Sequence, residues 1–332
     1  MLLEFDADQR LWQDTVRDAV AKQCPPALVR RVAEDGVDPV ELWKAYVDLG
    51  WTEMNEESSA VELAIVLEEL GRATDPTPFL ATMTQFAPLA GGRFEPHRTG
   101  ATVYDGVTAR RDADGWVLDG TARHVLDGDR AEELAVITDA AVFVVDAGAV
   151  SVRRTAVFDP VLHVAEVTFR GVRTSDTARV GADVERARHI ALAGMAITMV
   201  GACQRILELV LDHVRSRHQF GVPIGSFQAI QHKAADMHVA IERARALAYF
   251  AALTIAADDP RRRLAAVMAK AAAGECQALV FRHGLQSFGA MGFTWENDVQ
   301  FALKRAKAGE LMLGGAAEHR AVIAEEYRAA DF

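Results

Sequence analysis

The segment from Arg215 to Met237 reads R-S-R-H-Q-F-G-V-P-I-G-S-F-Q-A-I-Q-H-K-A-A-D-M, and the interpretation of the chain starts from it. One long helix is expected to end near its first arginines, before an aromatic residue, a glycine turn and a proline. Ser226 is expected to cap a second long helix. An arginine at such a corner, beside the N-terminus of a helix, can bind an anion. The alternative is an ordinary corner between two helices.

Long helical segments flank this corner on both sides. On its N-terminal side, one stripe of apolar residues recurs at helical spacing: Leu192, Met199, Cys203, Ile206, Val210 and Val214. On its C-terminal side, helices are predicted at 226–257 and 259–287. Long helices with short connections predict an antiparallel four-helix bundle, which the segment after Glu296 would complete.

The N-terminal region reads as three shorter helices. The first is expected to start at Asp8 as its N-cap, and the second to span 39–49 before the turn residue Gly50. The third is expected to span 59–70 and to stop at Gly71.

From about residue 98 to residue 179, the apolar pattern changes to short β-rich runs. Turns rich in aspartate and glycine separate these runs, which predicts a small antiparallel barrel or sandwich. The chain is therefore expected to be an α+β multidomain protein. Its expected domains are a helical domain at 1–95, a β domain at 96–180 and a helical bundle at 181–332.

Composition excludes several classes of function. The net charge of −11 makes nucleic acid or an anionic membrane surface an unsuitable partner. The three cysteines are scattered, which suits a reducing cytoplasm and predicts no metal site. The first residues carry no signal-peptide pattern, and no uncharged run is long enough to predict a membrane span.

The 215–237 segment closely resembles the R-x-x-F-G-x-x-I-x-x-F-Q signature of the acyl-CoA dehydrogenase family. The resemblance implies that Arg217, Phe220 and Gln228 contact the tail of an FAD bound mainly by a neighbouring subunit. Further along the chain, Q-S-F-G-A-M-G-F-T resembles the family element Q-x-x-G-G-x-G-F. It implies that Gln286 and Gly289 also line the FAD tail. The next glycine of the element is replaced here by Ala290.

The resemblance extends to the order of the parts along the chain. N-terminal helices, a small β domain and a C-terminal four-helix bundle make up the acyl-CoA dehydrogenase fold. Near residue 52 the family usually has a glycine-rich loop, where this chain has only T-E-M-N-E-E-S. The N-terminal domain is therefore expected to be trimmed.

Family elements that hold the flavin ring do not match this chain. No segment before Thr102 resembles the family's T-E-P-x-A-G-S-D loop, and His124-Val-Leu replaces its W-I-T segment. His124 has no cysteine, carboxylate pair or second histidine nearby in sequence to organise it. It is therefore interpreted as a surface or turn histidine, with a catalytic group as the alternative.

A catalytic base is also missing at both positions that the family uses. Dehydrogenation of an acyl-CoA needs a carboxylate to remove the α-proton, while the flavin accepts the β-hydride. Alignment places Ala191 and Gly314 at the two glutamate positions, so no catalytic residue is assigned. Carboxylates lie nearby in sequence at Glu185, Glu310 and Glu318, but a step along a helix turns a side chain by about 100°.

These features together resemble the short subunits of the heteromeric α2β2 acyl-CoA dehydrogenases of actinobacterial steroid side-chain catabolism. The resemblance implies a non-catalytic subunit that completes the FAD site of a second family member. That partner would bind most of the acyl-CoA and supply the base. One alternative is a self-sufficient dehydrogenase with a displaced carboxylate. Another is a helical-bundle interaction protein that binds no flavin.

Overall fold

The computed structural model describes residues 4–329, without the side chains of Glu57 and residues 327–329. Two compact units form within it. The first comprises Met1–Gly36, Glu57–Asp75 and Leu192–Phe332, and the second comprises Val37–Glu56 and Pro76–Ala191. The division of the sequence at residues 95 and 180 stays a prediction.

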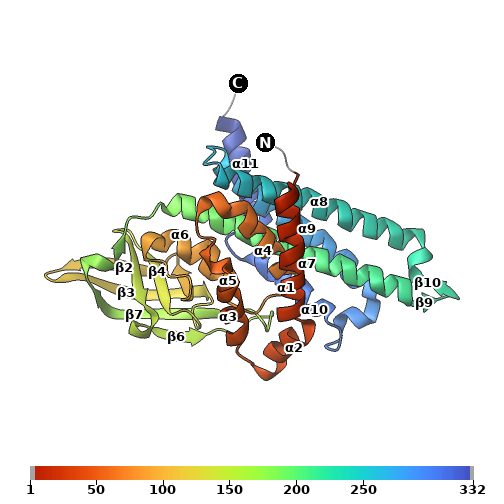
Figure 1. Ribbon diagram of the computed structural model, residues 1–332, viewed down its shortest axis with the longest axis horizontal. Helices are drawn as coiled ribbons and strands as arrows, with labels where there is room; N and C mark the ends of the chain where they lie inside the picture. The colour runs from red at the N-terminus through yellow and green to blue at the C-terminus, as the bar shows by residue number, and fades with distance from the viewer. Residues whose placement is uncertain (1–3, 330–332) are drawn as a thin grey trace. The chain divides into compact units, whose positions relative to one another are not determined.

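The first unit is helical. Its helices are α1 (Ala7–Gln23), α2 (Pro26–Asp35), α4 (Ala60–Ala73), α7 (Val184–Ser216), α8 (Gln228–Ala256), α9 (Arg262–Phe288), α10 (Val299–Leu311) and α11 (Ala316–Ala329) (Figure 1). Of α7, the part that begins at Leu192 belongs to this unit. The unit also contains a short hairpin of β9 (His218–Gln219) and β10 (Val222–Pro223). All six residues of the predicted apolar stripe on α7 are buried, which confirms the helical spacing.

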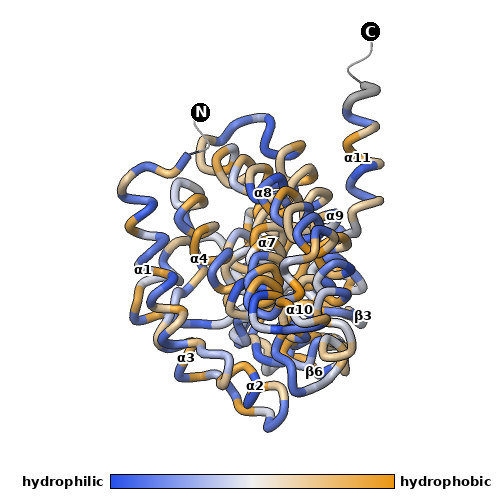
Figure 2. The backbone as a smooth tube through the Cα atoms, turned by 90° about the vertical axis from the view of Figure 1, so that its right-hand side faces the viewer, coloured by the Kyte–Doolittle hydropathy of each residue, from blue (hydrophilic) through white to orange (hydrophobic). Residues whose placement is uncertain are grey.

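Two details of the N-terminal helices differ from prediction. The N-cap of α1 is Asp6, which forms a capping box with Gln9, so the helix begins before Asp8. The turns of α1 alternate between hydrophilic and hydrophobic residues, as expected for a helix with one apolar face (Figure 2). Helix α4 does not stop at Gly71 but continues to Ala73, with Thr74 as a left-handed C-cap.

Gly71 lies inside α4 because the backbone of α7 passes close to it. A Cβ at this position would lie 2.2 Å from the carbonyl oxygen of Thr198. In the same way, a Cβ on Gly201 of α7 would lie 2.0 Å from the carbonyl oxygen of Glu68. The two glycines therefore serve helix–helix packing rather than helix termination.

The second unit carries the β-structure. It contains α3 (Val40–Asp48), α5 (Phe79–Ala81), α6 (Ala87–Ala90) and the strands β1 (Gly100–Val103), β2 (Val107–Asp112), β3 (Gly115–Leu126), β4 (Glu133–Ile137), β5 (Val142–Asp146), β6 (Ser151–Arg154), β7 (Val164–Thr174) and β8 (Arg179–Val180). Gly50 follows α3 with a φ of 73°, which confirms its predicted place after the helix.

The strands form two four-stranded sheets, with the orders β1-β4-β5-β8 and β2-β3-β7-β6. Buried side chains from both sheets share one core, as in a sandwich: Ala101, Val103, Val107, Leu118, Ala122, Val125, Leu134, Val136, Phe143, Val145, Ala165, Val167 and Phe169. The expectation of a purely antiparallel structure is wrong at one edge, where β1 and β4 are parallel.

Two helical segments, Val184–Ser216 and Arg262–Phe293, are long and apolar enough to cross a membrane by length and composition alone. Within the described residues, 83% and 67% of their most apolar windows are buried in the protein. Buried core helices pass the same test, so it assigns no membrane span.

Candidate cofactor-contact site

The corner after α7 is a tight β-hairpin. The N–H of Ile224 donates to the carbonyl of Arg217 at 2.8 Å and closes it. Phe220 and Gly221 occupy the turn with φ values of 54° and 82°, the pattern of a type I′ turn. A left-handed conformation costs a phenylalanine about 1–2 kcal/mol, and this ring is 93% exposed. The hairpin therefore presents an aromatic side chain at its tip.

Arg217 lies at the base of this hairpin, directly after α7, and is exposed. Its side chain makes no hydrogen bond or ion pair with any residue that the structure describes. Burial, together with the positive charge of Arg217, lowers the pKa of His213 in the last turn of α7. The guanidinium is thus a fixed positive charge whose donors face no protein acceptor.

The start of α8 differs from the prediction of a serine cap. Phe227 is the N-cap and makes no side-chain capping bond, while the Ser226 hydroxyl donates to the carbonyl of Pro223 at 2.7 Å. The prediction failed because the hydroxyl is used within the preceding turn. Gln228, the first residue of α8, is exposed. The first N–H groups of the helix are therefore more open to an anion than predicted.

The end of α9 lies next to the end of α7. The ring of His213 stacks on Phe288 with 4.5 Å between centroids. Gln286 is exposed in the last turn of α9, and Gly289 caps the helix with a φ of 60°. A Cβ on Gly289 would meet no atom within 4 Å, so a ligand could approach its backbone.

The five predicted contact residues thus come from three helix ends and from the hairpin that joins α7 to α8 (Figure 1). They combine an unpaired guanidinium, uncapped helix N–H groups, two exposed amides and an open glycine. This set of donors suits the negatively charged pyrophosphate in the tail of FAD. The roles of Arg217, Phe220, Gln228, Gln286 and Gly289 stay predictions.

The segment that replaces the family's ring-holding strand carries no comparable donor set. His124 is exposed, has a φ of 59° and lies where the pairing of β3 with β7 shifts register. Leu126, at the position of the family's threonine, is 5% exposed and apolar. Neither side chain supplies the tryptophan or the threonine that the resemblance implies for holding a flavin ring.

Neither position aligned with the family's base holds a titratable group. Ala191 in α7 is fully buried. Gly314 has a φ of 93°, and a Cβ there would lie 3.0 Å from Nε2 of His319 and 3.2 Å from Oε2 of Glu318. Of the nearby carboxylates, Glu310 accepts the N–H of Ala316 at 2.9 Å, which gives it a role in starting α11.

A buried lysine lies beneath Gly314. Lys270 of α9 is fully buried, and its Nζ donates to the carbonyl of Gly314 at 2.7 Å. Burial lowers the pKa of Lys270 to about 8, against the opposing effect of Glu310 and Glu318. The lysine thereby anchors the loop around Gly314 to α9.

This lysine makes the stability of the chain depend on pH. Between pH 8 and 10.5 the unfolded chain keeps the lysine proton while the folded chain loses it, so the free energy of unfolding rises with pH. The rise amounts to at most about 3 kcal/mol. In Lys270→Met we expect this part of the rise to vanish, measured by urea unfolding at pH 7.5 and 10. An equal rise in both proteins would contradict the assignment.

Comparisons with known proteins agree with this architecture. The family description "Acyl-CoA dehydrogenase, N-terminal domain" matches residues 6–90, and "Acyl-CoA dehydrogenase, C-terminal domain" matches residues 184–327. A protein of Mycolicibacterium smegmatis named "Acyl-CoA dehydrogenase IpdE2" is 30% identical over 325 residues, covering 92% of this chain and 94% of that protein.

Two solved structures share the fold. A chain of the "ChsE4-ChsE5 complex from Mycobacterium tuberculosis" is 24% identical, with a TM-score of 0.88 and coverage of 99% of both chains. A chain of the "Tcur3481-Tcur3483 steroid ACAD G363A variant" is 23% identical, with a TM-score of 0.86 and coverage of 98% of this chain and 99% of that chain.

Proposed function

Because the chain belongs to the acyl-CoA dehydrogenase family, whose members are FAD-binding flavoproteins, we propose that it is a non-catalytic subunit of a heteromeric dehydrogenase. In this proposal it completes the FAD site of a second family member in an α2β2 complex. The partner holds the flavin ring, binds most of the acyl-CoA and supplies the carboxylate base. The complex works in the cytoplasm, in keeping with three free, buried cysteines.

One contrast within the chain carries this proposal. The helix ends around Arg217 keep an exposed set of donors suited to an FAD tail. By contrast, Ala191 and Gly314 stand where a base is required, and His124 and Leu126 stand where a flavin ring is held. A chain of this kind is able to clamp a cofactor tail but has no group at those positions to remove an α-proton.

The names of the similar structures support the nature of the partner and the substrate. One is a complex of two differently named chains, and the other is called a steroid ACAD. By analogy, we propose that the substrate is a CoA thioester with a bulky, steroid-derived acyl group.

Within the complex, each contact residue has a distinct task. Arg217 and the first N–H groups of α8 neutralise the pyrophosphate of FAD. Gln228 and Gln286 donate hydrogen bonds to the tail, and Gly289 lets it approach the backbone. Phe220 packs against the partner or the cofactor, which offsets the strain of its backbone conformation. When FAD is bound, its flavin accepts the β-hydride.

The self-sufficient dehydrogenase is the competing reading, and a turnover assay separates the two. We expect no dye-linked oxidation of acyl-CoA by the chain alone, and turnover once the family member encoded beside it is co-expressed. Turnover by the chain alone would contradict the subunit proposal and would favour a displaced carboxylate as the base. A chain that neither binds flavin nor supports a partner would favour the interaction protein.

Restoring a glutamate is expected to give no turnover. In Gly314→Glu the new side chain must accept a φ of 93° and crowd His319 and Glu318. In Ala191→Glu a carboxylate would enter a fully buried position, at a cost of several kcal/mol. Stopped-flow mixing of acyl-CoA with each variant alone, in the presence of added FAD, would test both by following flavin reduction. Reduction by either variant would show that the site lacks only a base.

A further inference from the structure

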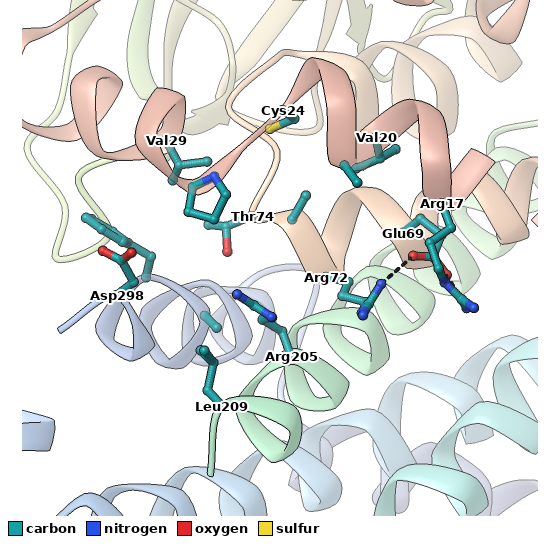
Figure 3. Close-up of a pocket in the computed structure, with 15 residues that line it drawn as sticks. Arg17, Val20, Cys24, Val29, Glu69, Arg72, Thr74, Arg205, Leu209 and Asp298 are labelled. Carbon is teal, nitrogen blue, oxygen red and sulfur yellow. Dashed lines mark hydrogen bonds and ion pairs between the residues drawn. The ribbon is translucent and has the colours of Figure 1, made fainter. Parts of the chain in front are cut away.

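A second concave site lies within the first unit, among α1, α2, α4, α7 and α10. It is a cavity of about 210 Å³ (Figure 3). Five helices contribute to its lining: Arg17, Val20, Ala21, Cys24, Pro26, Val29, Glu69, Arg72, Ala73, Thr74, Arg205, Leu209, Asp298, Phe301 and Ala302. No sequence motif joins these residues, which lie far apart in the chain.

One part of the wall is apolar and rigid. Val20, Val29 and Phe301 are at most 4% exposed. Cys24 is also buried, and burial raises the pKa of its thiol well above the ordinary value, so the thiol stays neutral. This part of the wall suits the hydrocarbon body of a ligand.

The other part of the wall is basic. Arg17 donates to Glu69 at 2.7 Å, and Arg72 donates to Glu208 at 2.9 Å. Arg205 approaches Glu208 only to 3.6 Å. Of these three arginines, Arg205 is the one that is held most loosely by a carboxylate. Asp298, also in the lining, is held by Arg30 at 2.5 Å.

A hydroxyl that lines the cavity faces the loosely paired arginine. Thr74 is 3% exposed in the left-handed C-cap of α4. Among the described residues, no hydrogen-bond partner of its hydroxyl is found. Figure 3 shows this hydroxyl and the guanidinium of Arg205 pointing toward one another across the cavity. Because Thr74 lines the cavity and its hydroxyl is not needed by another residue, a ligand oxygen placed between the two groups can bind both of them.

We propose that this cavity binds a small carboxylic acid, with its carboxylate between Arg205 and Thr74 and its chain against Val20, Val29 and Phe301. A single loosely paired guanidinium, that of Arg205, suits a carboxylate better than a phosphate dianion. The cavity is smaller than the ~300–1,000 Å³ pockets that hold drug-sized ligands, so a short acid is favoured. The proposal does not rest on the FAD contact or on a partner subunit.

Calorimetric titration with hexanoate tests the proposal on the purified protein, whether alone or in its complex. We expect saturable binding of one hexanoate per chain, and binding of the uncharged analogue hexanamide weaker by about tenfold or more. Absence of saturable binding in the millimolar range, or equal binding of hexanamide, would overturn the proposal.

Variants locate the site. Arg205→Gln and Thr74→Val should each weaken hexanoate binding, the first by about tenfold or more, whereas Arg205→Lys should retain part of it. Arg123→Gln, an exposed arginine of the β-structure, is the matched control and should bind as the parent does. Thermal unfolding confirms that each variant is folded, and Thr74→Val provides a second test if Arg205→Gln is not. Unchanged affinity in a folded Arg205→Gln or Thr74→Val would place hexanoate elsewhere.

Discussion

Arg217→Ala is expected to weaken the retention of FAD by the complex by on the order of ten- to a hundredfold. A lost hydrogen bond to a charged group costs about 1.5–3 kcal/mol, and each 1.4 kcal/mol is a factor of ten in affinity. The side chain has no protein partner among the described residues, so its removal leaves no group unsatisfied. Flavin absorbance after gel filtration, together with thermal unfolding with and without added FAD, measures the effect.

Arg215→Ala is the matched control for this experiment. Arg215 lies in the last turn of α7, is similarly exposed, and approaches Asp212 at 3.9 Å. Because the two variants change the net charge equally, a difference between them reports the position of Arg217. Unchanged flavin content and stability in Arg217→Ala would refute its assignment to the FAD tail.

Gly201→Ala is expected to lower the free energy of unfolding by about 3 kcal/mol or more. The added Cβ would lie 2.0 Å from the carbonyl oxygen of Glu68 and 2.8 Å from the amide nitrogen of Arg72. Both are backbone atoms of a packed helix, which cannot give way as a flexible side chain would. The helices would have to separate, and the contact between α4 and α7 would weaken.

The sign of this effect is diagnostic. In an uncrowded helix interior, alanine is more stable than glycine by about 1 kcal/mol. Gly92→Ala controls for the loss of a glycine without crowding: Gly92 lies in the single 3-10 turn Gly91–Arg93, and a Cβ there would meet no atom within 4 Å. Urea midpoints of the two variants and the parent give the comparison. A Gly201→Ala protein as stable as the parent would show that the two helices do not approach so closely.

Local patterns in the sequence predicted most of the fold. The apolar stripe on α7 gave a buried helix because a spacing of three and four residues defines one helix face. The short β-rich runs between residues 98 and 179, bounded by turns rich in aspartate and glycine, gave strands as predicted. Both signals lie within a short stretch of chain, so no tertiary information was needed.

The errors arose where a residue serves a distant part of the chain. Gly71 looked like a helix stop but allows α7 to approach, and no local pattern shows this. Ser226 looked like a cap, yet its hydroxyl is bound within the preceding turn. The parallel pairing of β1 with β4 brings together strands that are far apart in sequence. The cavity beside Thr74 is likewise made by helices that meet only in the folded chain.

The candidate FAD contacts came from motif resemblance, and the structure adds their physical setting. The structure shows that Phe220 has a strained backbone, that the start of α8 has no side-chain cap and that the backbone at Gly289 is open. None of these features can be read from the amino-acid sequence alone. The absence of a base at Ala191 and Gly314 stays a prediction from single positions. Because Ala191 is fully buried and a Cβ on Gly314 would crowd His319 and Glu318, we expect that a simple substitution would not supply one.

The ratio of FAD to protein chain tests the subunit proposal most directly. It should be measured by visible absorbance on this chain purified alone, and on the complex co-expressed with the family member encoded beside it. We expect a colourless chain alone and a yellow complex with one FAD per pair of chains. A yellow chain with one FAD per copy and turnover of its own would contradict the proposal.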